Sequence, residues 1–438
     1  MQRHTARSPQ PPKPNKIPPT RTYLERVTAL VPKAPGWTTV AFNSLALSSH
    51  YQPILSVAQR KVVGYEGLLL AHNGSGQVVR PETLFGMATV PAENLYLDLL
   101  ARALHVKNFP ALGAPGLLFL NVLPEASEDD PRVEHAFRKL LAHYDMLPRN
   151  VVVEILETGV SDERRLRDTV QLFKHLGCQV ALDDFGVGHS NFERLCSLQP
   201  DIVKIDRSVM QAAAKDRNEQ RALNNVVRMI HECGAAAVIE GVEERRDALI
   251  ALETDADYLQ GFYFAKPDRV PLDSAAAGGV FGSLLHLYES DADLKQVGAI
   301  PEVREYAWLL ENMAAAIERE AGFELAAEAL LDNPNAARTY LLGADGKREN
   351  HAFNLKSANA AQAQEPWRPN GRGWQLRHLI DSALGQPAQV HVSRSTLTAE
   401  GTQRCVTLAR ALNLKGERLV LCADLMLADG QQGELVAA

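Results

Sequence analysis

Polar and charged side chains recur at the ends of short apolar runs in this chain. The six runs, each with its polar residues, are LLFLN (Asn121), VVVEILE (Glu154 and Glu157), QVALDD (Asp183 and Asp184), IVKID (Lys204 and Asp206), AAVIEG (Glu240) and YLQG (Gln260). Carboxylate and amide oxygens are the ligands that hard divalent ions such as Mg²⁺ and Mn²⁺ prefer. One charged residue at the end of a strand does not indicate a site, but six polar strand ends at corresponding positions predict a metal-binding site.

The elements that must position these residues are strands, because the runs are short and β-branched and helical stretches lie between most of them. Strands that alternate with helices predict a parallel α/β sheet, and this number of strands predicts a TIM-like (β/α)8 barrel. In such a barrel the carboxyl ends of the strands surround one mouth, where active sites lie. The six runs therefore predict one site built from distant segments.

Chain length and net charge limit the number of domains and the classes of function that the protein can have. The chain has 438 residues, which predicts two or three domains. Its net charge of -7 argues against a general nucleic-acid binder, which is usually basic. An anionic substrate would then be received through metal ions and not through a basic surface.

The cysteines and the apolar stretches indicate the compartment. The five cysteines form no CxxC pair, which favours free thiols in a reducing compartment. No apolar stretch approaches the roughly 18 to 20 residues that span a membrane, and the N-terminal residues have no apolar secretion signal. We therefore expect a cytoplasmic protein without a membrane span.

The composition and the pattern of apolar residues predict four parts along the chain. Residues 1–36, rich in Pro, Lys and Arg, are expected to form a disordered arm, and residues 37–274 the barrel. Residues 275–334 are expected to be a linker, with a small-residue joint at 275–279 followed by amphipathic connector helices. Residues 335–438 read as a small α+β domain with antiparallel hairpins and a short polar tail.

The segment from Tyr51 to Pro267 resembles the EAL family of bacterial cyclic di-GMP phosphodiesterases. The matching segments are YQPI, VGYEGLLL, LFLNVLPE, VVVEILETG, VALDDFGVGHSNFERLCSLQPDIVKIDRSVM, AVIEGVEE and YLQGFYFAKP. The resemblance implies hydrolysis of cyclic di-GMP to linear pGpG with two Mg²⁺ or Mn²⁺ ions. It also implies a homodimer, because EAL domains commonly pair.

Roles are carried over residue by residue from this resemblance. The implied ligands of the first metal are Glu66, Asn121, Glu154 and Asp183. Asp184 would bind the second metal, and Glu240 would belong to the metal and water network. Lys204 would sit beside the nucleophilic water, as its base or to orient it, so Lys204, Glu66 and Glu240 are the implied catalytic residues.

A second group of residues is implied to bind substrate or to support the loop over the site. Its members are Gln52, Gln260, Glu157, Gly186, Gly188, Asp206 and Pro267. The two glycines of DDFGVGHS permit positive φ angles, which lets that loop close over metal and substrate.

Each residue also has a structural alternative. A strand-end glutamate can be a solvated terminus or part of a barrel salt bridge, Asn121 can cap a helix, and Lys204 can neutralise neighbouring acids. The adjacent Asp183 and Asp184 are harder to explain in this way, because two like charges in a mouth raise a pKa or recruit a cation.

The sequence departs from the family signature in three places. Glu66 is followed by Gly67-Leu68-Leu69-Leu70, where relatives carry Ala-Leu-Leu-Arg, and that arginine contacts a substrate phosphate. Val187 and His189 replace a Thr or Ala and an aromatic residue, and Leu156 stands where Thr is common. None of these changes removes an implied metal ligand.

Three hypotheses follow. The first is a working phosphodiesterase, and the second is a non-catalytic module that binds cyclic di-GMP or acts as a scaffold. The third, a phosphatase for another phosphoester, rests on the metal ring alone.

The C-terminal segments YLLGADGKREN, EPWRPNGRGW and RCVTLARALNLKGERLVLCADL resemble a PAS- or Cache-like sensor domain. Such a domain would bind an unknown small molecule, and its pocket candidates are Trp367, Arg368, Trp374, Arg394 and Asp424. Aromatic core residues and surface arginines explain the same positions.

Overall fold

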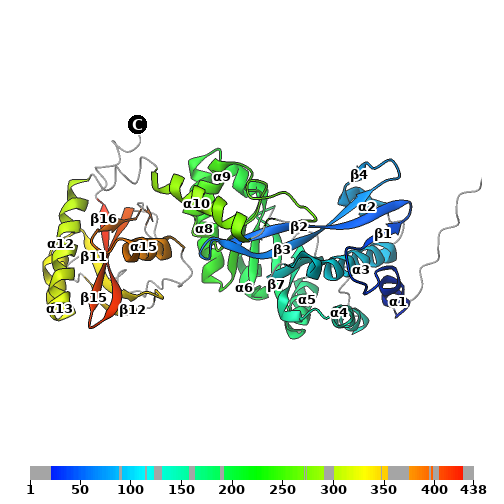
Figure 1. Ribbon diagram of the computed structural model, residues 1–438, viewed down its shortest axis with the longest axis horizontal. Helices are drawn as coiled ribbons and strands as arrows, with labels where there is room; N and C mark the ends of the chain where they lie inside the picture. Colours follow the sequence, from blue (N-terminus) through cyan, green and yellow to red (C-terminus); the bar gives the residue numbers. More distant parts are fainter. Residues whose placement is uncertain are drawn as a thin grey trace, which may run out of the picture.

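The structure is a computed structural model in which two units follow one another along the chain (Figure 1). It describes residues 21–87, 91–113, 116–122, 131–156, 163–187, 192–270, 272, 274–290, 300–346, 348–353, 374–393, 396–397 and 404–427.

The first unit contains a closed barrel of eight strands. They are β2 (Leu45–Ser56), β3 (Lys61–His72), β5 (Leu117–Val122), β6 (Val151–Leu156), β7 (Gln179–Phe185), β8 (Ile202–Ile205), β9 (Ala236–Ile239) and β10 (Tyr258–Leu259). The order around the barrel is β2-β10-β9-β8-β7-β6-β5-β3, and the pairing of β2 with β3 closes it. The predicted TIM-like barrel is confirmed.

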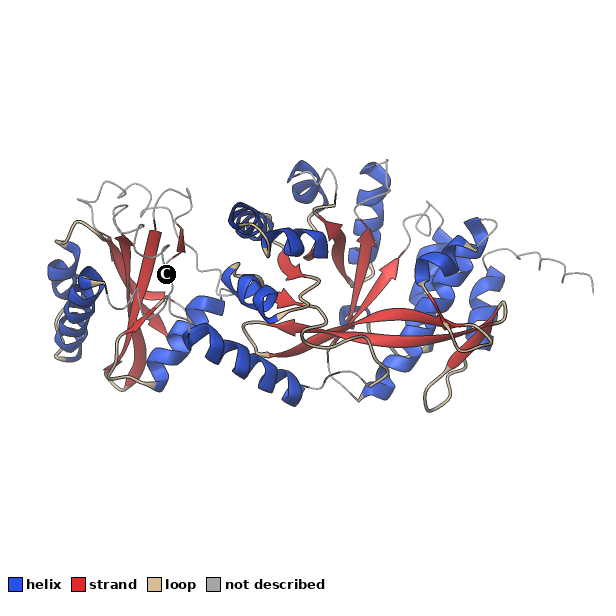
Figure 2. Cartoon of the chain, turned by 90° about the horizontal axis from the view of Figure 1, so that it is seen from above, coloured by secondary structure: helices blue, strands red, loops and turns tan. Residues whose placement is uncertain are grey.

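One strand departs from a purely parallel barrel. β2 runs antiparallel to both of its neighbours, β3 and β10, while the other pairs in the barrel are parallel. A tight turn joins β2 to β3, and only antiparallel strands can be joined so closely. The two strands continue beyond the barrel as a long ribbon (Figure 2), whose outer end pairs with β1 (Thr39–Phe42) and β4 (Val78–Val79).

Helices surround the strands and cover the ribbon (Figure 1). They are α1 (Arg21–Leu30), α2 (Pro81–Gly86), α3 (Pro91–Asn108), α4 (Pro131–His143), α5 (Glu163–His175), α6 (Phe192–Leu198), α7 (Arg207–Ala213), α8 (Arg217–Glu232), α9 (Arg245–Glu253) and α10 (Ser274–Ser290). Local signals set their starts: Asp216 accepts hydrogen bonds from the backbone N–H groups of Asn218 (2.7 Å) and Glu219 (3.2 Å) at the start of α8.

The prediction of a disordered arm over residues 1–36 is wrong for its second half. α1 begins at Arg21, and Val27 and Val31 are fully buried in the barrel unit. Tyr144 donates a hydrogen bond of 2.5 Å to the carbonyl of Val31. A few apolar residues among Pro, Lys and Arg are enough to anchor this helix, because burial against α3 and α4 supplies what composition does not indicate. Residues 1–20 lie outside the described part of the chain.

The predicted linker is also different. The small residues at 275–279 lie within helix α10, and Ala277, Phe281 and Leu284 of that helix are buried in the barrel unit's core. The connector helices α12 (Pro301–Glu318) and α13 (Phe323–Leu331) instead pack on the second unit, through Leu310 and Leu330 among others. Apolar faces at helical spacing thus predict helices correctly, but only the packing shows which unit each face covers.

The second unit is an antiparallel sheet with helices on both faces. Its remaining elements are β11 (Ala336–Gly343), β12 (Arg348–Phe353), α15 (Trp374–Gly385), β13 (His391–Val392), β14 (Thr396–Leu397), β15 (Arg404–Leu414) and β16 (Glu417–Leu427). The strand order is β12-β11-β16-β15-β13, with β14 also paired to β15. α12 and α13 cover one face, and α15 covers the other.

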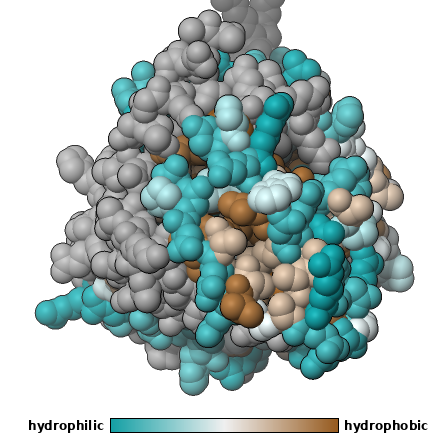
Figure 3. Space-filling model, turned by 90° about the vertical axis from the view of Figure 1, so that its left-hand side faces the viewer, coloured by the Kyte–Doolittle hydropathy of each residue, from teal (hydrophilic) through white to brown (hydrophobic). Residues whose placement is uncertain are grey.

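The outer side of α12 and α13 carries two large exposed apolar side chains, Trp308 (62% exposed) and Leu325 (65%). From that side of the molecule an apolar area is visible among polar residues (Figure 3). Among the described helices, none combines the length and apolar character needed to cross a membrane.

The two units touch at the turn between β2 and β3. Arg60 Nη2 lies 3.5 Å from Asp381 Oδ2 and 3.3 Å from His378 Nδ1, both on α15. Arg60 and Asp381 are 40% and 38% exposed, so solvent screens this ion pair.

Candidate active site

The barrel interior is built in two layers. The lower layer is apolar and contains Ile54, Phe119, Val152, Ala181, Ile202 and Val238. Side chains alternate along a strand with a period of two, so the residues two positions nearer the mouth face the same interior. Those residues are Gln52, Glu66, Asn121, Glu154, Asp183, Lys204, Glu240 and Gln260. The structure thus brings these predicted site residues into one layer above an apolar floor.

Lys204 lies at the centre of this layer. Its Nζ is 2.6 Å from Glu154 Oε1 and 2.7 Å from Glu240 Oε1. Asp183 Oδ1 lies 3.2 Å away, and Glu66 Oε2 3.5 Å away. Four carboxylates from four strands or strand ends therefore converge on one ammonium group that is 1% exposed.

Glu66 is held by two amides in addition to Lys204. Asn121 Nδ2 donates to Glu66 Oε1 (3.0 Å), and Gln260 Nε2 donates to Glu66 Oε2 (2.7 Å) and to Gln52 Oε1 (3.1 Å). Gln52 Nε2 in turn donates to the carbonyl of Ala265 (3.1 Å). The amides thus fix the orientation of the carboxylate, which is the role that groups around a metal ligand serve.

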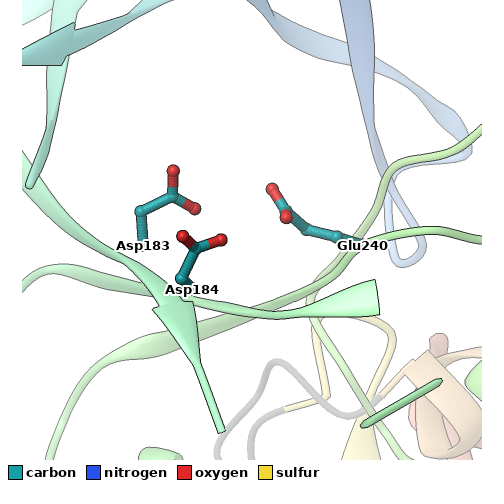
Figure 4. Close-up of side chains that lie close together, drawn as sticks. All are labelled: Asp183, Asp184 and Glu240. Carbon is teal, nitrogen blue, oxygen red and sulfur yellow. The ribbon is translucent and has the colours of Figure 1, made fainter. Parts of the chain in front are cut away.

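Asp183 and Asp184 both reach the mouth because the end of β7 is irregular. Adjacent residues of a regular strand face opposite sides, but the pairing of β7 with β8 shifts register between Leu182 and Phe185. Asp184 has a φ of 58°, a left-handed conformation that aspartate tolerates better than most residues. Its carboxylate therefore turns toward those of Asp183 and Glu240 (Figure 4), and one oxygen of each lies within 4.8 Å of the others.

Burial and mutual repulsion shift the titration of this cluster. Burial raises the pKa of Glu154, and Glu66 beside it adds to the effect. Burial also raises the pKa values of Asp183, Asp184 and Glu240, the last to about 8, although Lys204 opposes each shift. For Glu66, burial is outweighed by Lys204 and the two amides, so its pKa is lowered.

Lys204 remains charged. Burial by itself would lower its pKa, but the carboxylates of Asp183, Glu154, Glu240 and Glu66 outweigh that effect and raise the pKa well above the ordinary value. Within the described part of the chain, these four acids and Asp184 face a single ammonium group.

This donor set fits divalent cations. The negative charge exceeds the positive charge at a buried position, which is unfavourable unless cations or protons compensate. Among the described residues, no hydrogen-bond donor reaches Glu154 Oε2 or Gln260 Oε1, although both atoms are buried. Unsatisfied buried oxygens next to a carboxylate cluster are what hard oxygen-seeking ions require.

The predicted loop-support residues are placed in part. Asp206 caps α7 by accepting a hydrogen bond of 2.8 Å from the backbone N–H of Ser208, and its backbone N–H donates to the carbonyl of Phe185 (3.0 Å). Gly186 has a φ of 103°, and a Cβ there would lie 2.5 Å from Val209 Cγ2. Glu157 and Gly188 lie outside the described residues.

Sequence reasoning missed the close packing around three glycines that directly follow site residues. A Cβ at Gly67, after Glu66, would lie 2.9 Å from Cγ of the fully buried His105. A Cβ at Gly241, after Glu240, would collide with Arg207, and one at Gly261, after Gln260, with the backbone of Val242. The repeated order of polar residue then glycine was the available signal.

Asp424 is the sensor candidate whose side chain the structure describes. Trp367, Arg368 and Arg394 lie outside the described residues, as does the side chain of Trp374. Asp424 is 3% exposed and accepts hydrogen bonds from Arg338 Nε (2.5 Å), Thr407 Oγ1 (2.7 Å) and the Tyr340 hydroxyl (3.2 Å). The sequence did not identify Arg338 as its partner, because the two residues meet only through the pairing of β11 with β16.

Comparison with known proteins gives relatives for the barrel. RocR of Pseudomonas aeruginosa, named a cyclic di-GMP phosphodiesterase, is 29% identical over 224 residues, which cover 50% of this chain and 57% of RocR. PdeF of Escherichia coli, also named a cyclic di-GMP phosphodiesterase, is 30% identical over 132 residues, 30% of this chain and 17% of PdeF. The chain therefore spans less than two thirds of the length of these relatives.

A solved structure resembles both units. The crystal structure of the Bacillus subtilis YkuI protein, which has an EAL domain and is in complex with substrate c-di-GMP and calcium, has a TM-score of 0.52 and 22% identity. The match covers 87% of this chain and 96% of the YkuI chain, so it supports the fold beyond the barrel. The family profile described as EAL domain matches residues 38–267, more than half of the chain. The chain therefore belongs to the EAL domain family.

Proposed function

We propose that this chain hydrolyses cyclic di-GMP to linear pGpG. The observation that carries the proposal is the layer of buried carboxylates around Lys204, whose negative charge exceeds its positive charge. The relatives RocR and PdeF, which are named for this activity, support the choice of substrate.

Two divalent ions, Mg²⁺ or Mn²⁺, would be held by the acids and the amide of this layer. Glu66, Asn121, Glu154 and Asp183 would hold the first, Asp184 the second, and Glu240 would complete the network. Such ions lower the pKa of bound water and neutralise charge on a phosphodiester. Support comes from the unsatisfied oxygen of Glu154 and from the clustering of Asp183, Asp184 and Glu240.

The chain's own groups would orient the reactants. Lys204, fully charged and buried, would position the attacking water by hydrogen bonding and stabilise negative charge. Gln260 would use its unsatisfied Oε1 to accept a hydrogen bond from water or from the substrate. Gly186 would let the loop after β7 approach the mouth, since its φ of 103° excludes most other residues.

Leu70 favours a second candidate function, a non-catalytic receptor for cyclic di-GMP or an interaction scaffold. Leucine cannot make the bidentate phosphate contact of the arginine that EAL relatives carry at this position. The loss of such a contact would weaken substrate binding without removing any metal ligand.

Three further proposals concern the whole protein. The second unit would act as a PAS- or Cache-like sensor for a small molecule and would regulate the barrel, with Arg60, His378 and Asp381 as the contact between them. The chain would form a homodimer, and the exposed Trp308 and Leu325 offer an apolar surface of the kind that protein contacts cover. A cytoplasmic location agrees with five cysteines that form no disulfide.

Turnover of cyclic di-GMP with Mg²⁺ or Mn²⁺, followed by chromatography, tests the function. The parent should produce pGpG, and Glu66→Ala protein run in parallel should not. If the substrate remains intact at high protein concentration but binds in calorimetry, the receptor function replaces the enzyme. If the substrate neither turns over nor binds, the enzyme and the receptor functions both fail, and the interaction scaffold remains.

A further inference from the structure

The ribbon of β2 and β3 carries a strip of residues that leads outward from the acidic site. Opposed residues of an antiparallel pair share a face, and the register is unbroken from Ala46↔His72 to Gln52↔Glu66. The strip beyond Gln52 and Glu66 therefore consists of His50, Leu68, Ser48, Leu70, Ala46 and His72. The residues of the opposite face between them, Leu47, Ser49, Leu69 and Ala71, are buried.

Two histidines flank Leu70 along this strip. His50 lies opposite Leu68, one step nearer the acidic site, and His72 lies one step beyond Leu70. Both histidines are half-buried, and they interact electrostatically with each other. Each step of two residues advances about 7 Å, so His50 lies about 7 Å along the ribbon from the Gln52 and Glu66 pair.

An arginine from a different segment also lies at this strip. The backbone of Asp268 pairs with that of Tyr51, with N–O distances of 2.8 and 3.1 Å, so the chain after β10 runs along β2. The imidazole of His50 donates a hydrogen bond to the carbonyl of Pro267 and interacts electrostatically with Arg269 and Asp268. This pairing brings Arg269 to β2 beside His50, which lies one step from Leu70 along the strip.

We propose that Arg269, beside His50, makes the phosphate contact that Leu70 cannot make. The inference rests on the proposed function, because it concerns a cyclic dinucleotide bound at the acidic site. It assigns Arg269 as a substrate-binding residue supplied by the segment after β10, in place of an arginine on β3.

Arg269 is the member of this group with a permanent charge. A guanidinium stays protonated in proteins and offers the paired donors that match a phosphate, whereas burial lowers the pKa of His50. Asp268 is an acid that interacts with His50. Its Oδ1 already accepts hydrogen bonds from the backbone N–H groups of Arg269 (2.5 Å) and Val270 (3.2 Å).

The experiment measures binding of cyclic di-GMP by titration calorimetry with Ca²⁺ in place of Mg²⁺ or Mn²⁺, so that any turnover is held low. Arg269→Ala should weaken binding roughly tenfold to a hundredfold, as expected for the loss of a charge-assisted contact. Arg228→Ala is the matched control, because Arg228 is an exposed cation in the last turns of α8, away from the mouth. It should bind like the parent.

A second variant tests whether the two positions serve the same phosphate. Leu70→Arg added to Arg269→Ala should restore binding to within a few-fold of the parent. Equal binding by Arg269→Ala and the parent would overturn the inference and leave the proposed function standing, as would failure of Leu70→Arg to restore it in protein with unchanged circular dichroism. A parent that does not bind cyclic di-GMP would overturn both.

Discussion

Lys204 Nζ lies 2.6 Å from Glu154 Oε1 at a position where both side chains are almost completely buried, 1% and 0% exposed. The ion pair joins β8 to β6 across the barrel interior, and three further carboxylates lie within 4 Å of the same ammonium group. In the protein without metal, the positive charge of Lys204 offsets the repulsion between these carboxylates.

Replacement of Lys204 by Met should therefore destabilise the metal-free protein by about 3 kcal/mol or more, because removal of one partner leaves buried charges unpaired. Mn²⁺ should raise the melting temperature of Lys204→Met protein more than that of the parent, since the ions would take over the compensation. Thermal unfolding with and without Mn²⁺ measures both effects. Equal Mn²⁺-dependent shifts in the two proteins would contradict this reading.

Gly67 and His105 should be coupled. A Cβ at position 67 would lie 2.9 Å from His105 Cγ, so Gly67→Ala should cost about 1 to 3 kcal/mol of unfolding free energy through overpacking. His105→Ala removes the obstacle, and the double variant should be less destabilised than the sum of the single variants.

Urea unfolding of the four proteins in this cycle gives the coupling energy. Gly86→Ala is the control, because nothing lies within 4 Å of a Cβ there and the φ of Gly86 is not in the left-handed region. Strict additivity of the Gly67 and His105 changes would show that the ring moves aside without cost.

His105 should also make stability depend on pH. Burial lowers its pKa to about 3, whereas an unfolded histidine titrates near 6.5. As the pH falls below 6.5, His105 therefore takes up a proton in the unfolded chain before it does so in the folded protein. The free energy of unfolding then falls by up to about 1.4 kcal/mol per pH unit. This contribution is fully present above pH 6.5 and is lost progressively toward pH 3.

The parent should therefore lose more stability than His105→Gln protein between pH 7 and pH 5. Urea unfolding at several pH values measures the difference between the two proteins, both of which contain the acidic site. A difference that stays constant over this range would rule out a neutral buried His105.

The second unit should depend on Asp424. Asp424→Asn removes the buried charge that faces Arg338 and two hydroxyl groups, and a loss of about 3 kcal/mol is expected. Asp381→Asn, at an ion pair with 38% exposure, should cost under about 1 kcal/mol.

Hydrogen exchange locates the effect of these two variants. Amides of β11 and β16 should exchange faster in Asp424→Asn protein, while those of β5 to β8 should not change. Faster exchange in both units would instead mean that the two units unfold together.

The sequence by itself determined the barrel, because short β-branched runs between helical stretches admit few other folds. It also determined the strand-end members of the acidic layer, because strand-end positions in a barrel share one mouth. The family resemblance supplied Glu66 and Gln52, which no strand-end pattern in the sequence marks.

Only the tertiary structure decided how these residues meet. Strand register decides the antiparallel direction of β2 and the irregular end of β7 that turns Asp184 toward Asp183. Packing between distant segments decides the fit of His105 against Gly67. The placement of Arg269 beside the ribbon has the same origin, a backbone pairing between Tyr51 and Asp268. Local sequence patterns report periodicity and turns, but contacts between residues more than two hundred positions apart are set by closure of the barrel.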